Sequence, residues 1–278
     1  MWYSAIMSAS LSIIVPAFNE AGRLGESLPV ILEYLNRTHP SGELIVVDDG
    51  STDDTAAVAR RSFANPGSIN AKVITYQNNR GKGYAVRCGL AASQAPIALF
   101  SDADLSTPIT ETPKVVEPIE QGLCDVTFGS RALDRRLIGV HQPWRREQGG
   151  RVFNLIVRLA TRLPFWDTQC GFKAFRMSAC RPIIEAANID RFGFDVELLY
   201  VSQLAGLRLR EIPVRWDHKV GALDASGNYA RDSLRMINEV KRIRQQVDKG
   251  VYTEAISAAR TMSLVEQKQL HISGAPSG

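Results

Sequence analysis

Two aspartates separated by one residue form the segment of the chain best suited to chemistry. Asp102-Ala103-Asp104 follows the apolar run at 97–101 directly, at the carboxyl end of a predicted strand. In an open α/β sheet, ligands bind at that edge. Paired carboxylates are hard oxygen ligands, which suit a Mg²⁺ or Mn²⁺ ion that holds a diphosphate. The alternative for so short an acidic pair is a solvated turn without a ligand.

Three further polar segments fall just after predicted strands or at the start of a predicted helix. They are Pro16-Ala17-Phe18-Asn19-Glu20, Asp48-Asp49-Gly50-Ser51-Thr52-Asp53 and Arg80-Gly81-Lys82-Gly83. Each segment alone is typical of an ordinary turn or helix cap. Because the carboxyl ends of parallel strands meet at one edge of a sheet, we expect all three to line one crevice with the acidic pair.

The elements that must position these residues alternate between strand and helix in the first half of the chain. Short β-branched and apolar runs predict strands at 11–15, 43–47, 72–76 and 97–101. Apolar residues at helical spacing predict helices at 22–37, 52–63 and 83–93. Apolar strands that alternate with helices indicate an α/β fold, with a mostly parallel central sheet covered by helices.

The second half of the chain is less regular. Its patterns predict a helix between Pro108 and Pro118, strands at 125–129 and 210–216, and helices at 152–163, 183–206 (interrupted near Gly193) and 231–246. Pro213 inside the last strand predicts an edge position for it. We expect an N-terminal extension over residues 1–10, one domain over 11–248, and a weakly patterned, partly disordered tail over 249–278.

Composition excludes several classes of protein. The chain has 278 residues and 45% hydrophobic content, enough for one sizeable core. Its four cysteines form no Cys-x-x-Cys pair, which argues against a zinc site or a disulfide framework and fits a reducing cytosol. No run approaches 18 apolar residues and no basic stretch opens the chain, so we expect neither a membrane span nor a cleaved signal. With a net charge of only +4 we expect no nucleic-acid partner.

Positive charge is concentrated in one part of the chain. From Arg131 to Arg162 there are eight arginines, two acidic residues and no lysine. This block is either a solvated face or a site for anions such as phosphates or an acidic membrane surface. The predicted helix at 152–163 carries an apolar stripe that faces either the core or a membrane. The stripe consists of Phe153, Ile156, Leu159 and Leu163.

From about residue 11 to residue 244 the chain resembles the inverting family 2 glycosyltransferases of the Rossmann-like GT-A fold. It is most similar to the dolichyl-phosphate β-glucosyltransferases and their bacterial polyprenyl-phosphate relatives. The runs that carry this likeness are 102–108 (DADLSTP), 129–131 (GSR), 167–173 (DTQCGFK), 194–199 (FDVELL) and 212–216 (IPVRW). Ser106 stands where related mannosyl enzymes often have an amide, which favours the glucosyl group.

The resemblance implies a binding site for a nucleotide sugar, with UDP-glucose as the donor. Asp48 is placed to accept a hydrogen bond from the N3–H group of uracil. Pro16, Phe18 and Glu20 are expected to shape the base and ribose site. Lys82, at a helix start, adds positive charge where the diphosphate would lie.

By the same analogy the acidic pair holds the Mg²⁺ or Mn²⁺ ion. Asp104 is expected to ligate the metal, and Asp102 to contact the ribose or a metal-bound water as part of the same site. The metal then offsets the charge that develops on the leaving nucleoside diphosphate.

The acceptor depends on the arginines. A phosphate monoester already carries negative charge, so it needs positioning more than it needs a base, and arginine forks supply that positioning. By resemblance Arg131 and Arg151 are the candidates, with Arg145 and Arg146 as alternates.

If the acceptor were instead a sugar hydroxyl, a general base would be required. Asp195 or Asp167 would then be that base. Both carboxylates have a structural alternative, in which one orients Lys173 or caps a helix.

These expectations combine into one hypothesis with two alternatives. The protein would transfer glucose from UDP-glucose, with inversion, to a polyprenyl or dolichyl phosphate, as a peripheral protein at the cytosolic face of a membrane. The first alternative keeps the fold but uses GDP-mannose, UDP-GlcNAc or a soluble acceptor. The second is a non-catalytic protein that binds nucleotides or membranes. The oligomeric state is left open.

Overall fold

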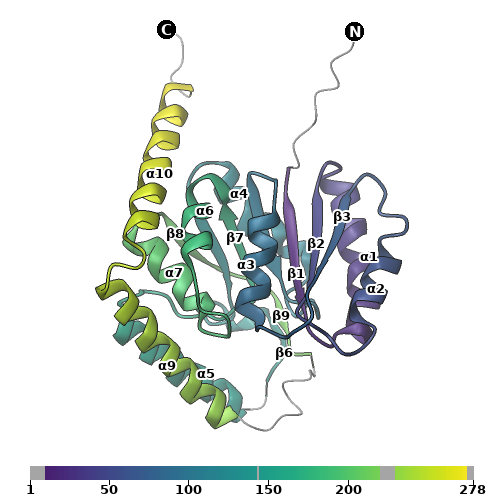
Figure 1. The fold of residues 1–278 in the computed structure, drawn as a ribbon, viewed down its shortest axis with the longest axis horizontal. Coiled ribbons are helices and arrows are strands. Elements are labelled where there is room, and N and C mark those ends of the chain that lie inside the picture. The colour runs from purple at the N-terminus through teal and green to yellow at the C-terminus, as the bar shows by residue number, and fades with distance from the viewer. Residues whose placement is uncertain (1–9, 143, 220–228, 274–278) are drawn as a thin grey trace.

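A computed structural model describes residues 10–142, 144–219 and 229–273, with the side chains of these ranges except 144–147, 229–234 and 267–273. Its centre is a seven-stranded sheet with the strand order β3-β2-β1-β4-β7-β5-β8 (Figure 1). The strands are β1 (Ser12–Ala17), β2 (Glu43–Asp48), β3 (Asn70–Thr75), β4 (Ile97–Ser101), β5 (Val126–Ser130), β7 (Phe172–Arg176) and β8 (Leu209–Pro213). A separate ribbon pairs β6 (Ile138–Val140) with β9 (Trp216–Asp217).

Neighbouring strands in the large sheet are parallel except where β7 is involved. β7 runs antiparallel to β4 on one side and to β5 on the other. The prediction of a mostly parallel α/β sheet is confirmed, whereas the sequence patterns did not predict β7. Pro213 ends β8, an edge strand, as expected for a residue that cannot donate a backbone hydrogen bond.

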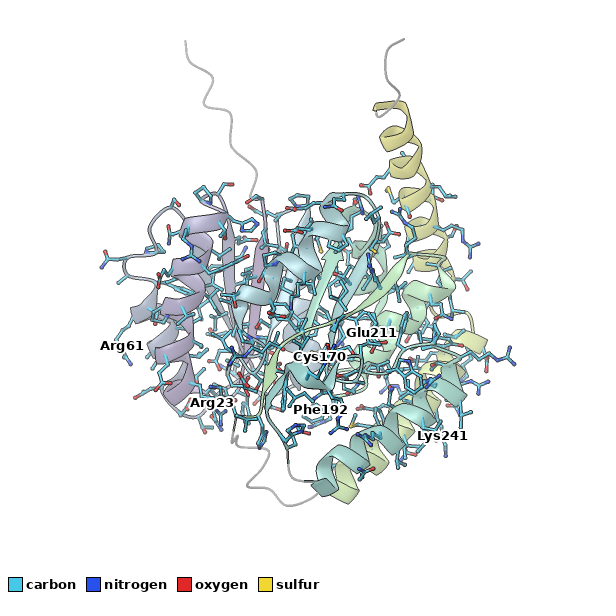
Figure 2. The ribbon with its side chains drawn as sticks, turned by 180° about the vertical axis from the view of Figure 1, so that it is seen from behind. Arg23, Arg61, Cys170, Phe192, Glu211 and Lys241 are labelled. Carbon is cyan, nitrogen blue, oxygen red and sulfur yellow. The ribbon has the colours of Figure 1, made fainter. Side chains whose placement is uncertain are left out.

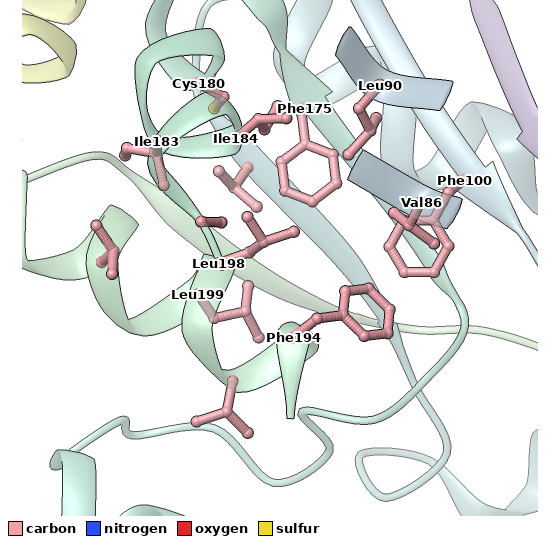
Figure 3. Packing of buried hydrophobic residues seen from close by; sticks show 14 of the residues in the cluster. Val86, Leu90, Phe100, Phe175, Cys180, Ile183, Ile184, Phe194, Leu198 and Leu199 are labelled. Atoms are coloured by element: carbon pink, nitrogen blue, oxygen red, sulfur yellow. The ribbon is translucent and has the colours of Figure 1, made fainter. Parts of the chain in front are cut away.

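The strands are apolar on both faces because helices cover both faces. In β1, Ile14 belongs to one hydrophobic cluster while Ile13 belongs to the other, since successive side chains of a strand point in opposite directions. Figure 3 shows the first cluster, in which Phe100 of β4 contacts Phe175 of β7 and Phe194 of α7 (Phe194–Leu204). The ring centroids lie 6.4 and 5.7 Å apart. These contacts fix the start of α7 against the middle of the sheet.

The covering helices divide between the two clusters. One face is covered by α1 (Ala21–Thr38), α2 (Thr55–Ser62) and α4 (Thr112–Glu120). The other is covered by α3 (Lys82–Ala92), α6 (Met177–Ala186) and α7. Short 3₁₀ turns at Ile109–Glu111 and Arg135–Leu137 complete the connections.

Two helices outside these layers lie side by side: α5 (Trp144–Thr161) and α9 (Tyr229–Asp248) (Figure 1). The segment 249–278, predicted as a partly disordered tail, contains the helix α10 (Thr253–Ser273). This helix packs against α6 and buries Ala259. Residues 274–278 and residues 1–9 of the predicted extension lie outside the described part. None of the described helices is both long enough and apolar enough to cross a membrane.

Candidate functional site

A cavity of about 1560 Å³ opens at the carboxyl edge of the sheet, with α5 as one wall. Figure 2 shows two of its lining residues, Arg23 and Phe192, in the lower part of the view, where α5 and α9 also lie. All but two of the residues predicted for the site line it, namely Pro16, Phe18, Glu20, Lys82, Asp102, Asp104, Arg131, Arg151 and Asp167. Among the described residues, Asp48 and Asp195 are not part of its lining.

The acidic pair is held by the turn that follows β4. Asp102 donates a backbone hydrogen bond of 3.1 Å to the Gly171 carbonyl, and the Asp104 carboxylate accepts one of 2.8 Å from the backbone of Ser106. Leu105 has a φ of 50°, which turns the chain sharply between Asp104 and Ser106. The Asp102 carboxylate lies against Gly171, because a Cβ atom at position 171 would be 2.1 Å from Asp102 Oδ2. Any larger residue at 171 would displace this carboxylate.

Lys82, the first residue of α3, forms an ion pair of 2.6 Å with Asp102. Burial alone lowers the pKa of Lys82, but the charges of Asp102 and Asp195 outweigh it and raise the pKa, so the amine stays protonated. Burial and the charge of Asp102 raise the pKa of Asp104 above its usual range. Added positive charge at this position would stabilise both ionised carboxylates.

The turn before Lys82 is fixed by Asp49, the neighbour of the predicted uracil-binding residue Asp48. The buried Asp49 carboxylate accepts four hydrogen bonds of 2.8 or 2.9 Å, from the Tyr76 hydroxyl, the Asn79 amide and the backbone N–H groups of Arg80 and Gly81. Asp49 also lines the cavity, while Asp48 accepts a hydrogen bond of 3.1 Å from the backbone of Ser51. The sequence signal was the acidic pair 48–49 as a whole, and only packing separates its two members.

The first two loops of the site are tied to each other. Asn19 has a φ of 54°, and its side-chain oxygen accepts a hydrogen bond of 2.9 Å from the backbone of Thr52. Phe18 remains 41% exposed at the cavity, where its ring is available for stacking. Glu20 is paired with Arg23 at 2.5 Å, and burial raises the pKa of Glu20.

Arg131, which directly follows β5, is held by Asp167 in a bidentate ion pair. Its Nε and Nη2 atoms donate to the two carboxylate oxygens at 2.7 and 2.8 Å, and its backbone donates to the same group at 3.0 Å. Burial alone raises the pKa of Asp167, but the charge and hydrogen bonds of Arg131 outweigh it and hold the pKa below its usual range. Asp167 is therefore a poor proton acceptor, and Nη1 is the part of the Arg131 guanidinium outside the pair.

Asp195 has a comparable partner in Lys173. Lys173 Nζ is fully buried in β7 and donates to Asp195 Oδ1 at 2.5 Å and to the Cys170 carbonyl at 2.6 Å. Burial raises the pKa of Asp195, and the charge of Lys173 offsets this only in part. The geometry favours the structural alternative, in which Asp195 anchors Lys173 behind the cavity wall.

Helix α5 presents two apolar faces. Phe153 and Val157 are buried in the core cluster, whereas Val152, Leu155 and Leu159 are 59, 54 and 75% exposed. The single stripe predicted from the sequence is therefore divided, because its Leu159 points to solvent. The exposed side carries the second stripe, which consists of Val152, Leu155 and Leu159. Of these three residues, Leu155 lines the cavity.

Basic side chains accompany this exposed stripe. Arg151 lines the cavity, and the guanidinium of Arg158 lies 4.0 Å from the centre of the Trp166 ring. Arg158 and Trp166 also line the cavity, although neither was predicted for the site. The side chains of the alternates Arg145 and Arg146 lie outside the described residues.

Comparison with known proteins identifies the family of the chain. The model of the family "Glycosyl transferase family 2" matches residues 12–184. The dolichyl-phosphate beta-glucosyltransferase of Homo sapiens is 35% identical over 229 residues, which cover 76% of this chain and 68% of that protein. The protein of the same name from Dictyostelium discoideum is 32% identical over 253 residues, which cover 87% and 76%.

A solved structure confirms the GT-A fold. The crystal structure of glucosyl-3-phosphoglycerate synthase from Mycobacterium tuberculosis, in complex with Mn²⁺ and UDP-glucose, matches with a TM-score of 0.59 at 21% identity. The match covers 84% of this chain and 79% of that chain. The protein is thus a GT-A enzyme that belongs to glycosyltransferase family 2.

Proposed function

We propose that the protein transfers glucose from UDP-glucose, with inversion, to a polyprenyl or dolichyl phosphate. The observation that carries the proposal is a single cavity with two chemically different walls. One wall holds Asp102, Asp104 and Lys82, which suit a metal-bound diphosphate. The other holds Arg131 and the arginines and exposed apolar residues of α5, which suit a phosphate on an apolar chain. The relatives from Homo sapiens and Dictyostelium discoideum are named dolichyl-phosphate beta-glucosyltransferases, which supports glucose as the transferred sugar and a dolichyl phosphate as the acceptor.

The donor wall fits a divalent cation. In the described part of the chain no three His, Cys, Asp or Glu side chains are grouped to hold a metal, so a cation here would need ligands from the diphosphate as well. Mg²⁺ is commonly bound in this way, by one or two carboxylates and substrate phosphates. Asp104, whose charge is costly in its present surroundings, would hold the Mg²⁺ or Mn²⁺ together with Asp102. The ion would supply charge neutralisation for the leaving UDP.

The acceptor wall fits a phosphate better than a hydroxyl. A hydroxyl acceptor needs a general base, and both candidate bases are committed to cations, Asp167 to Arg131 and Asp195 to Lys173. A phosphate monoester needs no base, because it is already an anion. Arg131 Nη1 and the exposed Arg151 are the groups available to orient it.

The exposed stripe of α5 suits a lipid surface. Val152, Leu155 and Leu159 follow one another at helical spacing, and Trp166, 56% exposed, lines the cavity together with Leu155. Arginines adjoin this stripe, as is typical of helices that lie on anionic membranes. A lipid phosphate bound here would keep its apolar chain in the bilayer while its headgroup reached the cavity. The contact would be peripheral, at the cytosolic face.

Transfer assays with defined substrates test this proposal. Purified protein with Mn²⁺ or Mg²⁺ is incubated with radiolabelled UDP-glucose and one of three acceptors, namely undecaprenyl phosphate, dolichyl phosphate or 3-phosphoglycerate. We expect a lipid-linked glucose that depends on the metal, with GDP-mannose and UDP-GlcNAc as poorer donors. 3-Phosphoglycerate is included because the structural relative was also crystallised with phosphoglyceric acid. Transfer to it alone, or no lipid product while UDP binding is intact, would contradict the lipid acceptor.

A further inference from the structure

One residue that lines the cavity carries a buried polar atom with no hydrogen-bond partner among the described residues. Among the described side chains, four buried nitrogen or oxygen atoms make no hydrogen bond: Ser27 Oγ, Ser93 Oγ, Gln169 Nε2 and Arg176 Nε. Of these four residues, only Gln169 lines the cavity. Arg176 Nε still lies 3.3 Å from a carboxylate oxygen of Asp125, and both serines belong to the α1 and α3 regions away from the site. The Gln169 side chain is partly exposed as a whole, while its Nε2 atom is buried. A buried amide nitrogen without a partner is costly, and natural proteins rarely keep one without a reason.

The backbone around Gln169 is fixed from both sides. Its own N–H donates to Asp167 Oδ1 at 3.1 Å, so the residue belongs to the same turn that holds Arg131. Two residues later, the carbonyl of Gly171 accepts the backbone hydrogen bond of Asp102, and the Asp102 carboxylate packs against the Cα atom of Gly171. Gln169 therefore lies on the short segment that joins the acceptor wall to the donor wall.

The order of groups in the reaction places the sugar at this segment. In a nucleotide-sugar donor the transferred sugar lies between the diphosphate and the attacking acceptor. The diphosphate belongs beside Asp102 and Lys82, and the acceptor phosphate beside Arg131. A neutral amide between them can bind a neutral hydroxyl, whereas a charged group there would interact with the phosphates on either side.

We propose that the side-chain amide of Gln169 hydrogen-bonds a hydroxyl group of the transferred sugar and thereby helps to select it. This inference rests on the proposed function, since it takes the donor to be a nucleotide sugar. It makes Gln169 a specificity-determining residue that was not among the predicted site residues. The partly exposed side chain of Gln169 at the cavity is then the group that contacts the sugar.

Binding measurements separate this role from a structural one. Isothermal titration calorimetry in the presence of Mn²⁺ measures how much a variant weakens the binding of UDP-glucose and of UDP, so that a loss confined to UDP-glucose is assigned to the sugar. The Gln169→Met variant keeps the length of the side chain and removes the amide. We expect it to lose roughly tenfold in affinity for UDP-glucose while UDP binding changes less than about threefold, because one hydrogen bond to the sugar is removed. Gln121→Met, on an exposed residue after α4, is the matched control and should behave as the unmodified protein.

Donor analogues identify the hydroxyl group involved. UDP-2-deoxyglucose, UDP-6-deoxyglucose and UDP-galactose each lack or invert one hydroxyl. One of them should lose affinity in the unmodified protein but show no additional loss in Gln169→Met. If Gln169→Met unfolds in thermal denaturation, Gln169→Asn, which withdraws the amide, takes its place.

The outcomes distinguish this inference from the proposed function. Equal losses for UDP and UDP-glucose, or equal losses for all donors, would overturn the sugar contact and leave Gln169 with a structural role. Absence of lipid-linked product, with the Gln169-dependent preference for UDP-glucose intact, would overturn only the acceptor.

Discussion

Arg131 and Asp167 meet in a bidentate ion pair, with N–O distances of 2.7 and 2.8 Å. The planar guanidinium is therefore held at one edge by a carboxylate of its own chain, which leaves the opposite edge to meet a ligand. An arginine fixed in this way loses less conformational entropy when it binds a phosphate than a free one does.

Asp167→Asn should affect the acceptor more than the donor. The amide has one acceptor oxygen where the carboxylate has two, so it cannot accept the hydrogen bonds of both Arg131 Nε and Arg131 Nη2 in the same way. The guanidinium therefore loses its orientation. We expect kcat/KM for the lipid phosphate to fall by about 100-fold, as small misplacements of a positioning group can do. The KM for UDP-glucose should change by less than about twofold. Steady-state kinetics with each substrate varied in turn measure both, and equal losses for both substrates would refute the assigned role.

Asp104→Asn should abolish transfer without weakening the fold. The raised pKa of Asp104 means that its surroundings disfavour the ionised form, so an uncharged amide costs the folded protein nothing in the absence of a cation. We expect the thermal midpoint of the metal-free protein to stay equal or rise. The stabilisation that UDP and Mn²⁺ give the unmodified protein should disappear. A large fall of the metal-free midpoint would show that Asp104 is structural.

Asp49→Asn should disturb the turn that carries Lys82. The amide offers one acceptor oxygen and an NH₂ group, which would face the N–H donors of Asn79 and Gly81. We expect a loss of about 2 kcal/mol in the free energy of unfolding and about tenfold in kcat/KM for UDP-glucose. Asp48→Asn is the matched variant: if Asp48 contacts uracil, it should lose UDP affinity with little change in unfolding. Urea denaturation and UDP titration distinguish the two residues.

Leu159→Glu should weaken attachment to membranes. It places a charge in the exposed stripe of α5 at its most exposed position, 75% accessible. We expect at least a tenfold weaker binding to liposomes that contain anionic lipids, because a carboxylate cannot enter the apolar layer and is repelled by the headgroups. Leu123→Glu is the control, because Leu123 is 55% exposed but lies before the amino end of β5, away from the cavity. Equal binding of the two variants would exclude the stripe as the membrane-binding surface.

Stability at low pH should depend on Asp125, which is buried and paired with Arg208 at 2.9 and 3.1 Å. Burial alone raises the pKa of Asp125, but the hydrogen bonds and charge of Arg208 outweigh it and hold the pKa below its usual value. The unfolded chain therefore takes up the proton first as pH falls. The contribution of the pair is complete above about pH 4 and is lost as pH falls through the lower pKa of the folded state.

The Asp125→Asn variant should accordingly be less stable near neutral pH, by about 3 kcal/mol. Its free energy of unfolding should fall less steeply below about pH 4 than that of the unmodified protein. Urea denaturation across this pH range measures the difference. Asp248→Asn, at the exposed end of α9, should change neither quantity, and a parallel shift of both variants would contradict the role of the buried pair.

The sequence allowed the first half of the sheet to be predicted, because apolar strands such as 43–47 and helical spacing such as that of Leu24 and Leu28 are local signals. It did not reveal β7, since a five-residue strand that contains Lys173 and Arg176 has the pattern of a partly polar segment. Only the fold brings Asp195, 22 residues away, to neutralise that lysine.

The candidate site shows the same division. Asp102, Asp104 and Lys82 were predicted from motifs at strand ends, and the structure brings them to one cavity. The role of Asp49 in the turn before Lys82 and the ion pair between Arg131 and Asp167, 36 residues apart, depend on packing that no local pattern encodes. Gln169 was visible only as one letter of a motif, because its unpartnered nitrogen is a property of the folded chain.

The antiparallel strand β7 also determines when the central sheet can be completed during synthesis of the chain. β7 lies between β4 and β5, so a nascent chain that ends before residue 172 has the four strands β3-β2-β1-β4 as a sheet and β5 without a neighbouring strand in that sheet. The segment 167–171, which joins the donor wall to the acceptor wall, is fixed only when β7 enters that gap. A ribosome-bound chain should therefore gain the ability to bind UDP-glucose abruptly, after β7 has left the exit tunnel, and chains arrested earlier should expose β4 as an unpaired edge that invites aggregation.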